Sequence, residues 1–418
     1  MKRKIYIPAG LFTAIISFTL SANAQNTVSP YSIYGPGDID YKMYNRTSGM
    51  GGTGLALRSS GYVIDNNPAG IAGLTRSFYV FSVAGAGKTV SFSGTPINST
   101  NSGSNDFWVK GASFAIKINK FWASSFGFSQ LSNVNYQFTG TKQIEGSTSL
   151  YDVVYQGTGG LNDYYWTNAF SIGKHLSLGV KSSFIAGGIG HTETETDAAL
   201  AATIQSTQQD YMYHLKFEYG CIYNTALNKK WDFSVGGKFS YKTKLPSDRT
   251  LTVIENGATT INNQYVSSNS LFLPTTTGAG ISFSHNKKAT FAADYIFDNW
   301  APLKQRGIGW QLVNNQRISA GTEFSKQQNF FGQVVEKKFL QVGAYYNTGY
   351  LMVGDKQINQ FGITAGTGGY LKGLMYNLSL DVGQRGTRQN NLIKENYFQF
   401  TIAISYRDFL ASKGRKYD

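Results

Sequence analysis

The sequence predicts an all-β protein: a transmembrane antiparallel β-barrel of about 14 strands with an N-terminal plug, or hatch, inside the lumen. An export signal opens the chain, and two-faced strands long enough to cross a membrane follow from about residue 76. The composition agrees with this class. The 47 Gly, 27 Tyr and 28 Phe, against 8 Pro and 15% charged residues, describe many strands joined by small turn residues.

Residues 1–24 have the organisation of a cleaved secretory signal. A basic start at residues 2–4 precedes an apolar run from Ile5 to Leu20, and the small-residue motif Ala22-Asn23-Ala24 follows. We expect cleavage before Gln25. An uncleaved anchor fits less well, because Pro8 interrupts a run already short for a membrane-spanning helix. Beyond this run no stretch approaches the roughly 18 apolar residues of a membrane helix, so the exported chain is either soluble or crosses as strands.

The alternation of side chains decides between these two. From residue 231 to 242 one face of the predicted strand is apolar or aromatic from Trp231 to Tyr241, and the other face is polar or small. Trp231 and Tyr241 lie about 33 Å apart along a strand. At a tilt of about 40° this projects to roughly 25 Å, the height of the apolar band of an outer-membrane barrel. A soluble β core would use wholly apolar central strands, whereas the polar face recurs here at 176–184, 374–383 and 397–406.

The predicted strands alternate between tight and long connections. The tight ones fall near residues 120, 174, 229, 287 and 372, whereas those at 139–161, 195–207 and 246–271 are long. Short periplasmic turns and long outer loops are typical of membrane barrels. The connection at 327–336 is longer than this scheme expects. The strands are expected near 77–93, 107–119, 121–138, 162–174, 176–194, 208–227, 231–244, 272–285, 289–299, 314–326, 337–349, 357–370, 374–385 and 394–409.

The segment between the signal and the first strand is the material for a plug. Barrels of about 8 strands are filled by their own side chains and those of 16 to 18 hold an aqueous channel, so a lumen of 14 strands needs an occupant. Four glycines, Gly49, Gly51, Gly52 and Gly54, permit tight backbone turns inside that lumen. The expected organisation is 1–24 signal peptide, 25–75 N-terminal extension and hatch, 76–410 barrel and 411–418 basic periplasmic tail.

At this segment the sequence resembles a known family. G-M-G-G-T-G-L-A-L at 49–57, followed by N-P-A-G at 67–70, is similar to the hatch of the FadL-type outer-membrane transporters of long-chain fatty acids and hydrocarbons. The resemblance implies a monomeric barrel that captures a hydrophobic ligand outside and releases it laterally when the hatch moves. It also implies that the matching residues Asn67, Pro68, Ala69 and Gly70 gate the path, with the four glycines as hatch turns.

Two departures from that family concern the ends of the chain. An additional segment at 25–47 precedes the hatch motif, and it either enlarges the plug or contacts a periplasmic partner. The last strand ends near Phe409 and is followed by the basic tail, whereas outer-membrane barrels commonly finish on an aromatic residue. Other barrels of the superfamily share the hatch motif while acting in protein export, so a protein partner, periplasmic or secreted, is the alternative to a transported ligand.

Composition and spacing argue against other classes. The net charge of +14, or +11 without the three basic signal residues, is spread along the sequence as single residues, which disfavours nucleic-acid binding. The stretch Asp197–Gln209 is Ala-rich and is expected to form a short helix in an outer loop. The four histidines are far apart in the sequence, so neither a metal site nor a nucleophile with its base is expected: His175, His191, His214 and His285.

Three classes of function follow from these observations. We expect a passive transporter of small hydrophobic molecules in the outer membrane of a Gram-negative bacterium, surrounded by outer-membrane lipid and working without a cofactor. A structural or export-associated barrel that binds a protein partner is the second interpretation. An outer-membrane hydrolase is the third and is the least supported, so the chain is predicted not to be an enzyme.

Overall fold

The computed structural model describes residues 29–409 except positions 77, 96, 98–101, 144–149, 198–201, 331–332 and 372–373. The expected signal peptide, its cleavage point before Gln25 and the basic tail at 411–418 lie outside the described residues.

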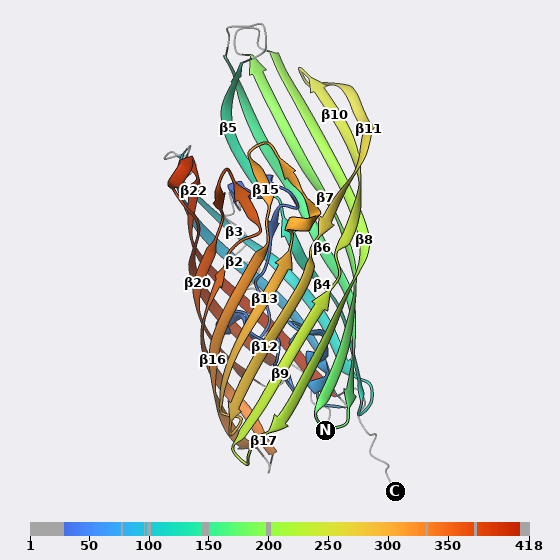
Figure 1. Cartoon of the computed structure of the whole chain (residues 1–418), viewed down its shortest axis with the longest axis vertical. Helices are drawn as coiled ribbons and strands as arrows, with labels where there is room; N and C mark the ends of the chain where they lie inside the picture. The colour runs from blue at the N-terminus through green and yellow to red at the C-terminus, as the bar shows by residue number, and fades with distance from the viewer. Residues whose placement is uncertain are drawn as a thin grey trace, which may run out of the picture.

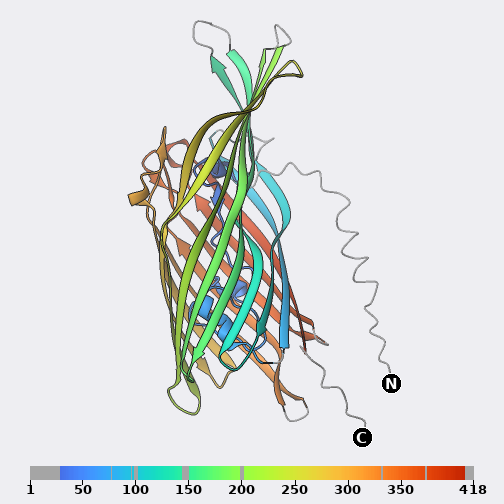
Figure 2. The ribbon, with the colours of Figure 1, turned by 90° about the vertical axis from the view of Figure 1, so that its right-hand side faces the viewer.

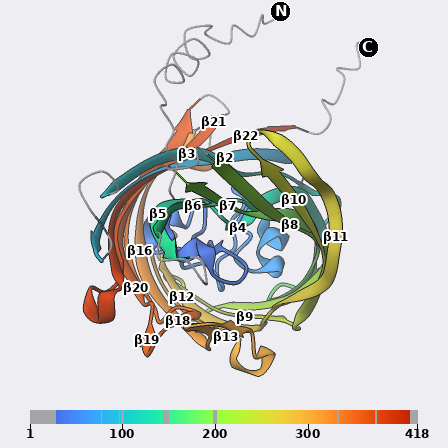
Figure 3. The ribbon, with the colours of Figure 1, turned by 90° about the horizontal axis from the view of Figure 1, so that it is seen from above.

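Fourteen antiparallel strands form a closed barrel, in which the first strand, β2, pairs with the last, β22 (Figures 1 and 3). The predicted antiparallel β-barrel and its strand number are confirmed. The barrel strands are, in order around the ring, β2 (Phe78–Gly94), β3 (Gly103–Lys117), β4 (Trp122–Asn133), β6 (Leu150–Ile172), β7 (Leu176–Asp197), β8 (Ala202–Ala226), β9 (Trp231–Ser240), β12 (Thr275–His285), β13 (Ala289–Asn299), β16 (Asn315–Phe330), β17 (Gln333–Asn347), β20 (Gln360–Leu371), β21 (Leu374–Gly386) and β22. β22 spans Ile393–Phe409.

The alternation of side chains produces an apolar exterior around a polar interior. In β8 the side chains of Tyr213, Leu215 and Phe217 are exposed, while the charged Lys216 and Glu218 on the other face are partly buried. A barrel wall exposed to lipid needs this arrangement, because the apolar surface then faces hydrocarbon and the polar groups face the lumen. No helix in the described part of the chain is long enough and apolar enough to cross a membrane.

The two ends of the barrel differ, and we call them the turn end and the loop end. Tight turns join β3 to β4, β6 to β7, β8 to β9 and β12 to β13 at the turn end. The expected longer connection at 327–336 is wrong. Gln327 pairs with Glu336, and Phe330 pairs with Gln333, so the two strands continue and only residues 331–332 join them.

Part of the wall rises above the rest at the loop end as one curved sheet, which we call the upper sheet (Figure 2). It consists of the outer parts of β6, β7 and β8 with β5 (Tyr136–Gln143), β10 (Thr243–Glu255) and β11 (Ala258–Leu273). The long loops expected at 139–161, 195–207 and 246–271 are therefore largely strands. The short helix expected at Asp197–Gln209 is also wrong, because residues 202–209 pair with β7 as part of β8. The outer parts of these strands lack the alternation of apolar and polar residues although their pairing continues.

Short elements complete the described structure. Four short strands form a separate sheet at the loop end: β14 (Arg306–Gly307), β15 (Trp310–Leu312), β18 (Leu351–Val353) and β19 (Lys356–Gln357). The remaining elements are β1 (Asp38–Ile39) and the 3-10 helices η1 (Pro30–Ile33), η2 (Ser48–Met50), η3 (Pro68–Gly73), η4 (Ala301–Leu303) and η5 (Gln389–Asn391).

Residues 29–74, which we call the inner segment, lie inside the barrel (Figure 3). The segment begins at the loop end, where the Tyr31 hydroxyl donates to the Ile393 carbonyl at 2.6 Å. It reaches the turn end at Ala72, whose carbonyl accepts a hydrogen bond from the Lys117 ammonium. The chain then enters the wall as β2.

Candidate functional site

The first part of the inner segment closes the loop end of the lumen. Ser29 caps η1 by accepting from the Tyr31 amide at 3.2 Å, and its hydroxyl donates to Glu395 in the wall. The Tyr350 hydroxyl donates to the Gly37 carbonyl at 2.6 Å. An apolar cluster surrounds these contacts and includes Tyr31, Val134, Tyr136, Leu161, Ile185, Ile189, Met212, Leu245, Leu273, Trp300, Leu312, Tyr350, Leu351 and Ile358. Residues 29–37, the first described part of the 25–47 extension, thus lie within the loop end of the barrel.

Below this cluster, charged side chains of the inner segment form ion pairs with the barrel wall. Residues 38, 40 and 42 alternate along an extended stretch, so their side chains reach the wall on one face. All the carboxylates and cations involved are mostly buried. The pairs are Asp38–Arg385 at 2.6 Å, Asp40–Lys110 at 2.8 Å, Lys42–Asp381 at 2.8 Å, and Arg46 with Glu323 and Glu336 at 2.6 Å each.

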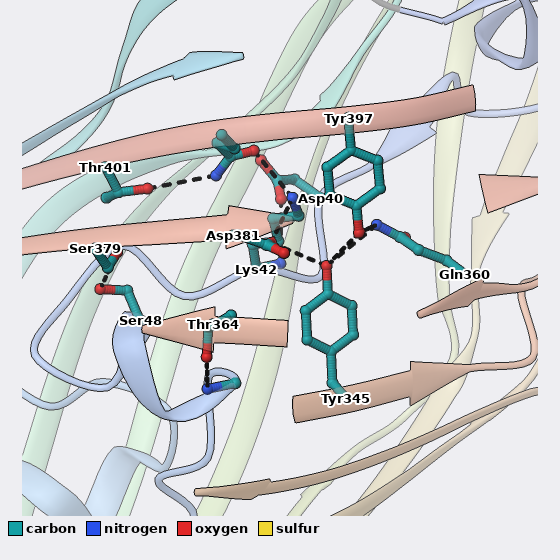
Figure 4. A network of polar contacts seen from close by, with 12 residues as sticks. Asp40, Lys42, Ser48, Tyr345, Gln360, Thr364, Ser379, Asp381, Tyr397 and Thr401 are labelled. Carbon is teal, nitrogen blue, oxygen red and sulfur yellow. Dashed lines mark hydrogen bonds and ion pairs between the residues drawn. The ribbon is translucent and has the colours of Figure 1, made fainter. Parts of the chain in front are cut away.

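The Lys42 pair belongs to a wider polar network (Figure 4). The Lys42 ammonium lies 4.2 Å from the centre of the Tyr397 ring, in addition to its pair with Asp381. The Tyr345 hydroxyl donates to Asp381 at 2.9 Å, and Tyr345 and Tyr397 share a hydrogen bond of 2.6 Å. Gln360 donates to the Tyr397 hydroxyl at 2.9 Å. The network therefore joins the inner segment to β17, β20, β21 and β22.

Arg46 makes the densest of these contacts. Its guanidinium donates two hydrogen bonds to Glu323, at 2.9 and 2.6 Å, and two to Glu336, at 2.9 and 2.6 Å. The guanidinium carbon lies 4.4 Å from the ring centres of both Tyr62 and Phe339. Two bidentate pairs and two aromatic faces use nearly the full bonding capacity of a guanidinium, which an ammonium could not match.

The glycine-rich stretch turns sharply against the wall. Gly51 and Gly52 have φ values of 68° and 74°, which L side chains rarely adopt. The Thr364 hydroxyl accepts from the Gly51 amide at 2.8 Å, and Arg317 donates to the Gly51 carbonyl at 2.8 Å. The Gly54 amide donates to Asp294 at 2.6 Å. Side chains of the wall thus satisfy backbone groups that secondary structure leaves unpaired.

Glycines of the wall let the inner segment approach backbone to backbone, and we call them the glycine belt. A Cβ on Gly236 would lie 2.0 Å from the Leu55 carbonyl oxygen, and a Cβ on Gly343 would lie 2.2 Å from the Met50 carbonyl carbon. The belt lies on seven strands and contains three directly opposed pairs: Gly179 with Gly220, Gly236 with Gly280, Gly321 with Gly343, and in addition Gly366.

Asn67, the first of the predicted gating residues, connects the inner segment to two wall strands. Its side-chain oxygen accepts from the Ala69 amide at 3.0 Å and so caps η3. Its amide nitrogen lies 2.8 Å from the Leu55 carbonyl oxygen and 3.1 Å from those of Cys221 and Gly237. The next three predicted residues are also buried: Pro68, Ala69 and Gly70. The motif is thus a fixed contact with β8 and β9 in this state.

Replacing Asn67 by alanine is expected to lower the free energy of unfolding by about 1–3 kcal/mol, because buried carbonyl oxygens lose their donor. Trypsin cleavage after Arg58 in the inner segment should become faster, while the barrel keeps its folded mobility on unheated gels. Thr259→Ala, at an exposed position of β11, serves as the control and should change neither measurement. An Asn67→Ala protein as resistant to trypsin as the parent would remove this anchoring role from the motif.

A cavity of about 250 Å³ lies beside residues 39–46 of the inner segment, and side chains of β2, β3, β4, β6, β7, β8, β9 and β22 are among those that line it. Its lining is mixed. Charged side chains border its deeper part, where Lys181 pairs with Asp163 at 2.7 Å and Lys238 lies 3.6 Å from Glu218. Charged side chains of β7, β8 and β9 thus also face the cavity.

The wall beside this cavity contains a seam between β3 and β4. The pairing of the two strands stops at Gly111 and Ser129, and the outer half of β3 pairs with β2 alone. Across the seam Gln130 accepts hydrogen bonds from Trp108 at 2.7 Å and Lys110 at 3.0 Å. From the lumen side β1 pairs with the end of β4. Side-chain hydrogen bonds and the inner segment therefore cover the part of the wall where β3 and β4 are not paired through their backbones.

The histidines are not brought together. His191 shares a hydrogen bond of 2.7 Å with the Tyr136 hydroxyl, and His175 and His285 lie at separate turns of the turn end. Within the described residues, no group of three or more His, Cys, Asp and Glu side chains is arranged to hold a metal ion.

Sequence reasoning missed the ion pairs and the glycine belt. Charges spaced by two residues at 38, 40 and 42, in a segment expected inside a polar lumen, were the available signal for wall contacts. The sequence also contained an indication of the glycine belt, because Gly236 is one of the residues on the polar, lumen-facing side of the predicted strand 231–242. A lumen-facing residue without a side chain indicates close approach of another backbone.

Comparison with known proteins gives one matching family and several solved structures of similar fold. The model of a family described as BamG matches residues 1–418. Among solved structures, the toluene transporter TodX of Pseudomonas putida has 14% identity and a TM-score of 0.58, covering 89% of this chain and 100% of TodX. A FadL homologue of Pseudomonas aeruginosa has 10% identity and a TM-score of 0.58, covering 90% and 100%. The toluene transporter TbuX of Ralstonia pickettii has 13% identity and a TM-score of 0.55, covering 88% and 98%.

At these identities the likeness to the solved structures shows a shared fold. No curated protein matches the chain.

Proposed function

The chain belongs to the BamG family, and we propose that it is an outer-membrane barrel held closed by its inner segment and acting through a protein partner. The observation that carries this proposal is the anchoring of the segment, through buried ion pairs to β3, β16, β17 and β21 and through the glycine belt. A segment attached on this scale is suited to a permanent structural element. The inner segment then blocks the lumen permanently and does not move aside to let a solute pass.

The surroundings of the lumen support this interpretation. The apolar cluster at the loop end covers the route from outside, and the cavity beneath it is bordered by lysine and carboxylate side chains. Charged groups that are already paired give little attraction to an apolar solute. The short turns of such barrels face the periplasm, so we place the turn end there and the upper sheet outside the cell.

The proposal is tested by purifying the full-length protein from the outer membrane in mild detergent. We expect a protein to co-purify in a fixed ratio, and the isolated barrel to show no conductance in planar bilayers. A barrel that comes out alone, from cells whose uptake of labelled toluene or palmitate falls when the gene is deleted, would contradict the proposal and favour transport.

The transport of small hydrophobic molecules is the second candidate, and the seam between β3 and β4 favours it. The fold is that of solved toluene transporters, and the seam adjoins the cavity on the lipid-facing wall. On this interpretation Asp40 and Lys110 form the latch of a lateral exit. Burial alone would raise the pKa of Asp40, but the Lys110 ammonium outweighs it and holds that pKa below its usual range. The Asp40 carboxylate of the latch therefore loses its charge as the pH falls through that lowered pKa.

Asp40→Asn is the test of the seam. It leaves the Lys110 ammonium buried without its carboxylate, at a cost of roughly 3–5 kcal/mol. If the seam conducts, uptake of labelled toluene by cells should rise relative to the parent. The double variant Asp40→Asn with Lys110→Met removes both charges and should return uptake toward the parent value. Asp355→Asn, at an exposed position, is the control. Unchanged uptake in Asp40→Asn would remove the seam from any transport path.

A further inference from the structure

Exposed basic side chains gather at the turn end of the barrel. The sequence disperses them as single residues and pairs, but the fold brings their turns to one level. Ten of them are exposed there: Arg76, Lys120, Lys174, Lys229, Lys230, Lys287, Lys288, Lys326, Lys337 and Lys338. These basic residues are dispersed along the sequence, as the sequence analysis found. In the folded barrel, however, they lie together at one end.

Seven of these ten lie on or beside three neighbouring connections, β8–β9, β12–β13 and β16–β17, and we call them the lysine arc: Lys229, Lys230, Lys287, Lys288, and, in the adjoining ends of β16 and β17, Lys326, Lys337 and Lys338. Backbone hydrogen bonds join the three connections. The Asn286 amide donates to the Lys230 carbonyl at 2.7 Å, and the Ser325 amide donates to the Lys288 carbonyl at 2.7 Å. The arc is therefore one continuous and fixed surface.

Nearby acidic groups do not neutralise the arc. Glu323 and Glu336 are both bound to Arg46 inside the barrel, and Asp232 is half-buried. Within the described residues, none of the seven lysines forms an ion pair. Seven like charges held at short range repel one another, and an acidic surface placed against them would relieve that repulsion.

Among the described residues, the exposed positive charge at the turn end is concentrated on one side of the ring. The described turns between β3 and β4 and between β6 and β7 carry one lysine each, Lys120 and Lys174. A layer of phospholipid headgroups surrounds all turns of a barrel alike, so it gives no reason for an arc on three adjacent connections. A partner protein that contacts one side of the barrel does give such a reason.

We infer that the lysine arc is the docking site for an acidic face of a periplasmic protein partner. This inference rests on the proposed function and gives its partner a location and a charge. Electrostatic complementarity of this kind directs association and fixes orientation, and salt weakens it because the charges are exposed.

The test compares two triple charge reversals with the same number of changes. Lys230→Glu, Lys287→Glu and Lys288→Glu alter the arc, and Arg76→Glu, Lys120→Glu and Lys174→Glu alter exposed charges outside it. The first measurement uses the purified full-length barrel and a fluorescent peptide of ten glutamates as the probe. We expect the arc variant to bind the peptide roughly tenfold more weakly than the parent, and the control variant to change binding by less than about twofold. Equal losses in the two variants would overturn the inference.

The second measurement is the amount of partner protein that co-purifies from outer membranes. The arc variant should lose it and the control variant should retain it. If the arc variant keeps a stoichiometric partner, the inference fails while the proposed function stands. If no variant, nor the parent, carries a protein, the proposed function fails. Loss of binding to vesicles with anionic phospholipid, together with full retention of the partner, would assign the arc to lipid and overturn the protein-docking site.

Discussion

Arg46→Ala is expected to open a conducting path through the barrel in planar bilayers and to lower the free energy of unfolding by about 3–5 kcal/mol. The variant leaves Glu323 and Glu336 in place, with side chains only 12% and 25% exposed, and removes the cation that pairs with both. Two carboxylates close together and without a counter-charge repel each other and are poorly hydrated. The wall in that region then no longer holds the inner segment.

A matched control separates this effect from the loss of any ion pair. Lys142 also pairs with two glutamates, Glu193 and Glu195, but in the upper sheet, where the lysine side chain is 47% exposed. Lys142→Ala should change stability by less than about 1 kcal/mol and leave the barrel closed, because exposed pairs contribute little. Arg46→Lys should fall between these cases, since an ammonium cannot make two bidentate pairs.

A triple variant tests whether uncompensated charge is the cause. Arg46→Met with Glu323→Gln and Glu336→Gln removes all three charges and retains side chains of similar size. Replacing a buried ion group by neutral residues is often nearly neutral for stability, so the triple variant should remain closed. Conductance as large in the triple variant as in Arg46→Ala would show that the specific hydrogen bonds, and not the charge balance, hold the segment.

The fold could be predicted from the sequence because a lipid environment imposes a pattern that survives in every strand. Trp231–Lys242 shows it clearly, with one apolar and one polar face. The upper sheet could not be predicted in the same way. The outer parts of β10 and β11 show no alternation of apolar and polar residues, so they resembled loops in the sequence, although Leu245 and Leu273 near the inner ends of these strands are buried.

The contacts between the inner segment and the wall could not be predicted from local sequence patterns either, but for a different reason. Arg46 and Glu323 are 277 positions apart, and Asp38 and Arg385 are 347 positions apart. Only the closure of the barrel brings such residues together, and the register of each strand decides which wall charge lies at which depth. Tight turning at Gly51 and Gly52 was predictable because it depends on their own backbone, whereas the belt that receives them depends on seven strands.

A substitution in the glycine belt is the second change for which we expect a large loss of stability. The neighbouring glycine of β9 provides the control. Gly236→Ala places a methyl group 2.0 Å from the Leu55 carbonyl oxygen, far inside van der Waals contact. Gly237→Ala, on the lipid-facing side, places it 3.4 Å from the nearest atom, the Cys221 sulfur. The two changes share their chemistry and strand, and they differ only in what the new methyl group meets.

We expect Gly236→Ala to destabilise the protein by about 1–3 kcal/mol, the usual cost of an overpacked interior. Gly237→Ala should be neutral or stabilising by about 0.5–1 kcal/mol, because alanine loses less conformational freedom than glycine in a strand. The contacted atom belongs to the backbone of the inner segment, so no change of rotamer can relieve the clash and the segment itself must move. Trypsin should therefore cleave after Arg58 faster in Gly236→Ala than in Gly237→Ala, with guanidinium unfolding midpoints in the corresponding order. If both variants resist trypsin equally, the segment moves more easily than its contacts imply, and the case for a permanently closed barrel gives way to the case for a gate.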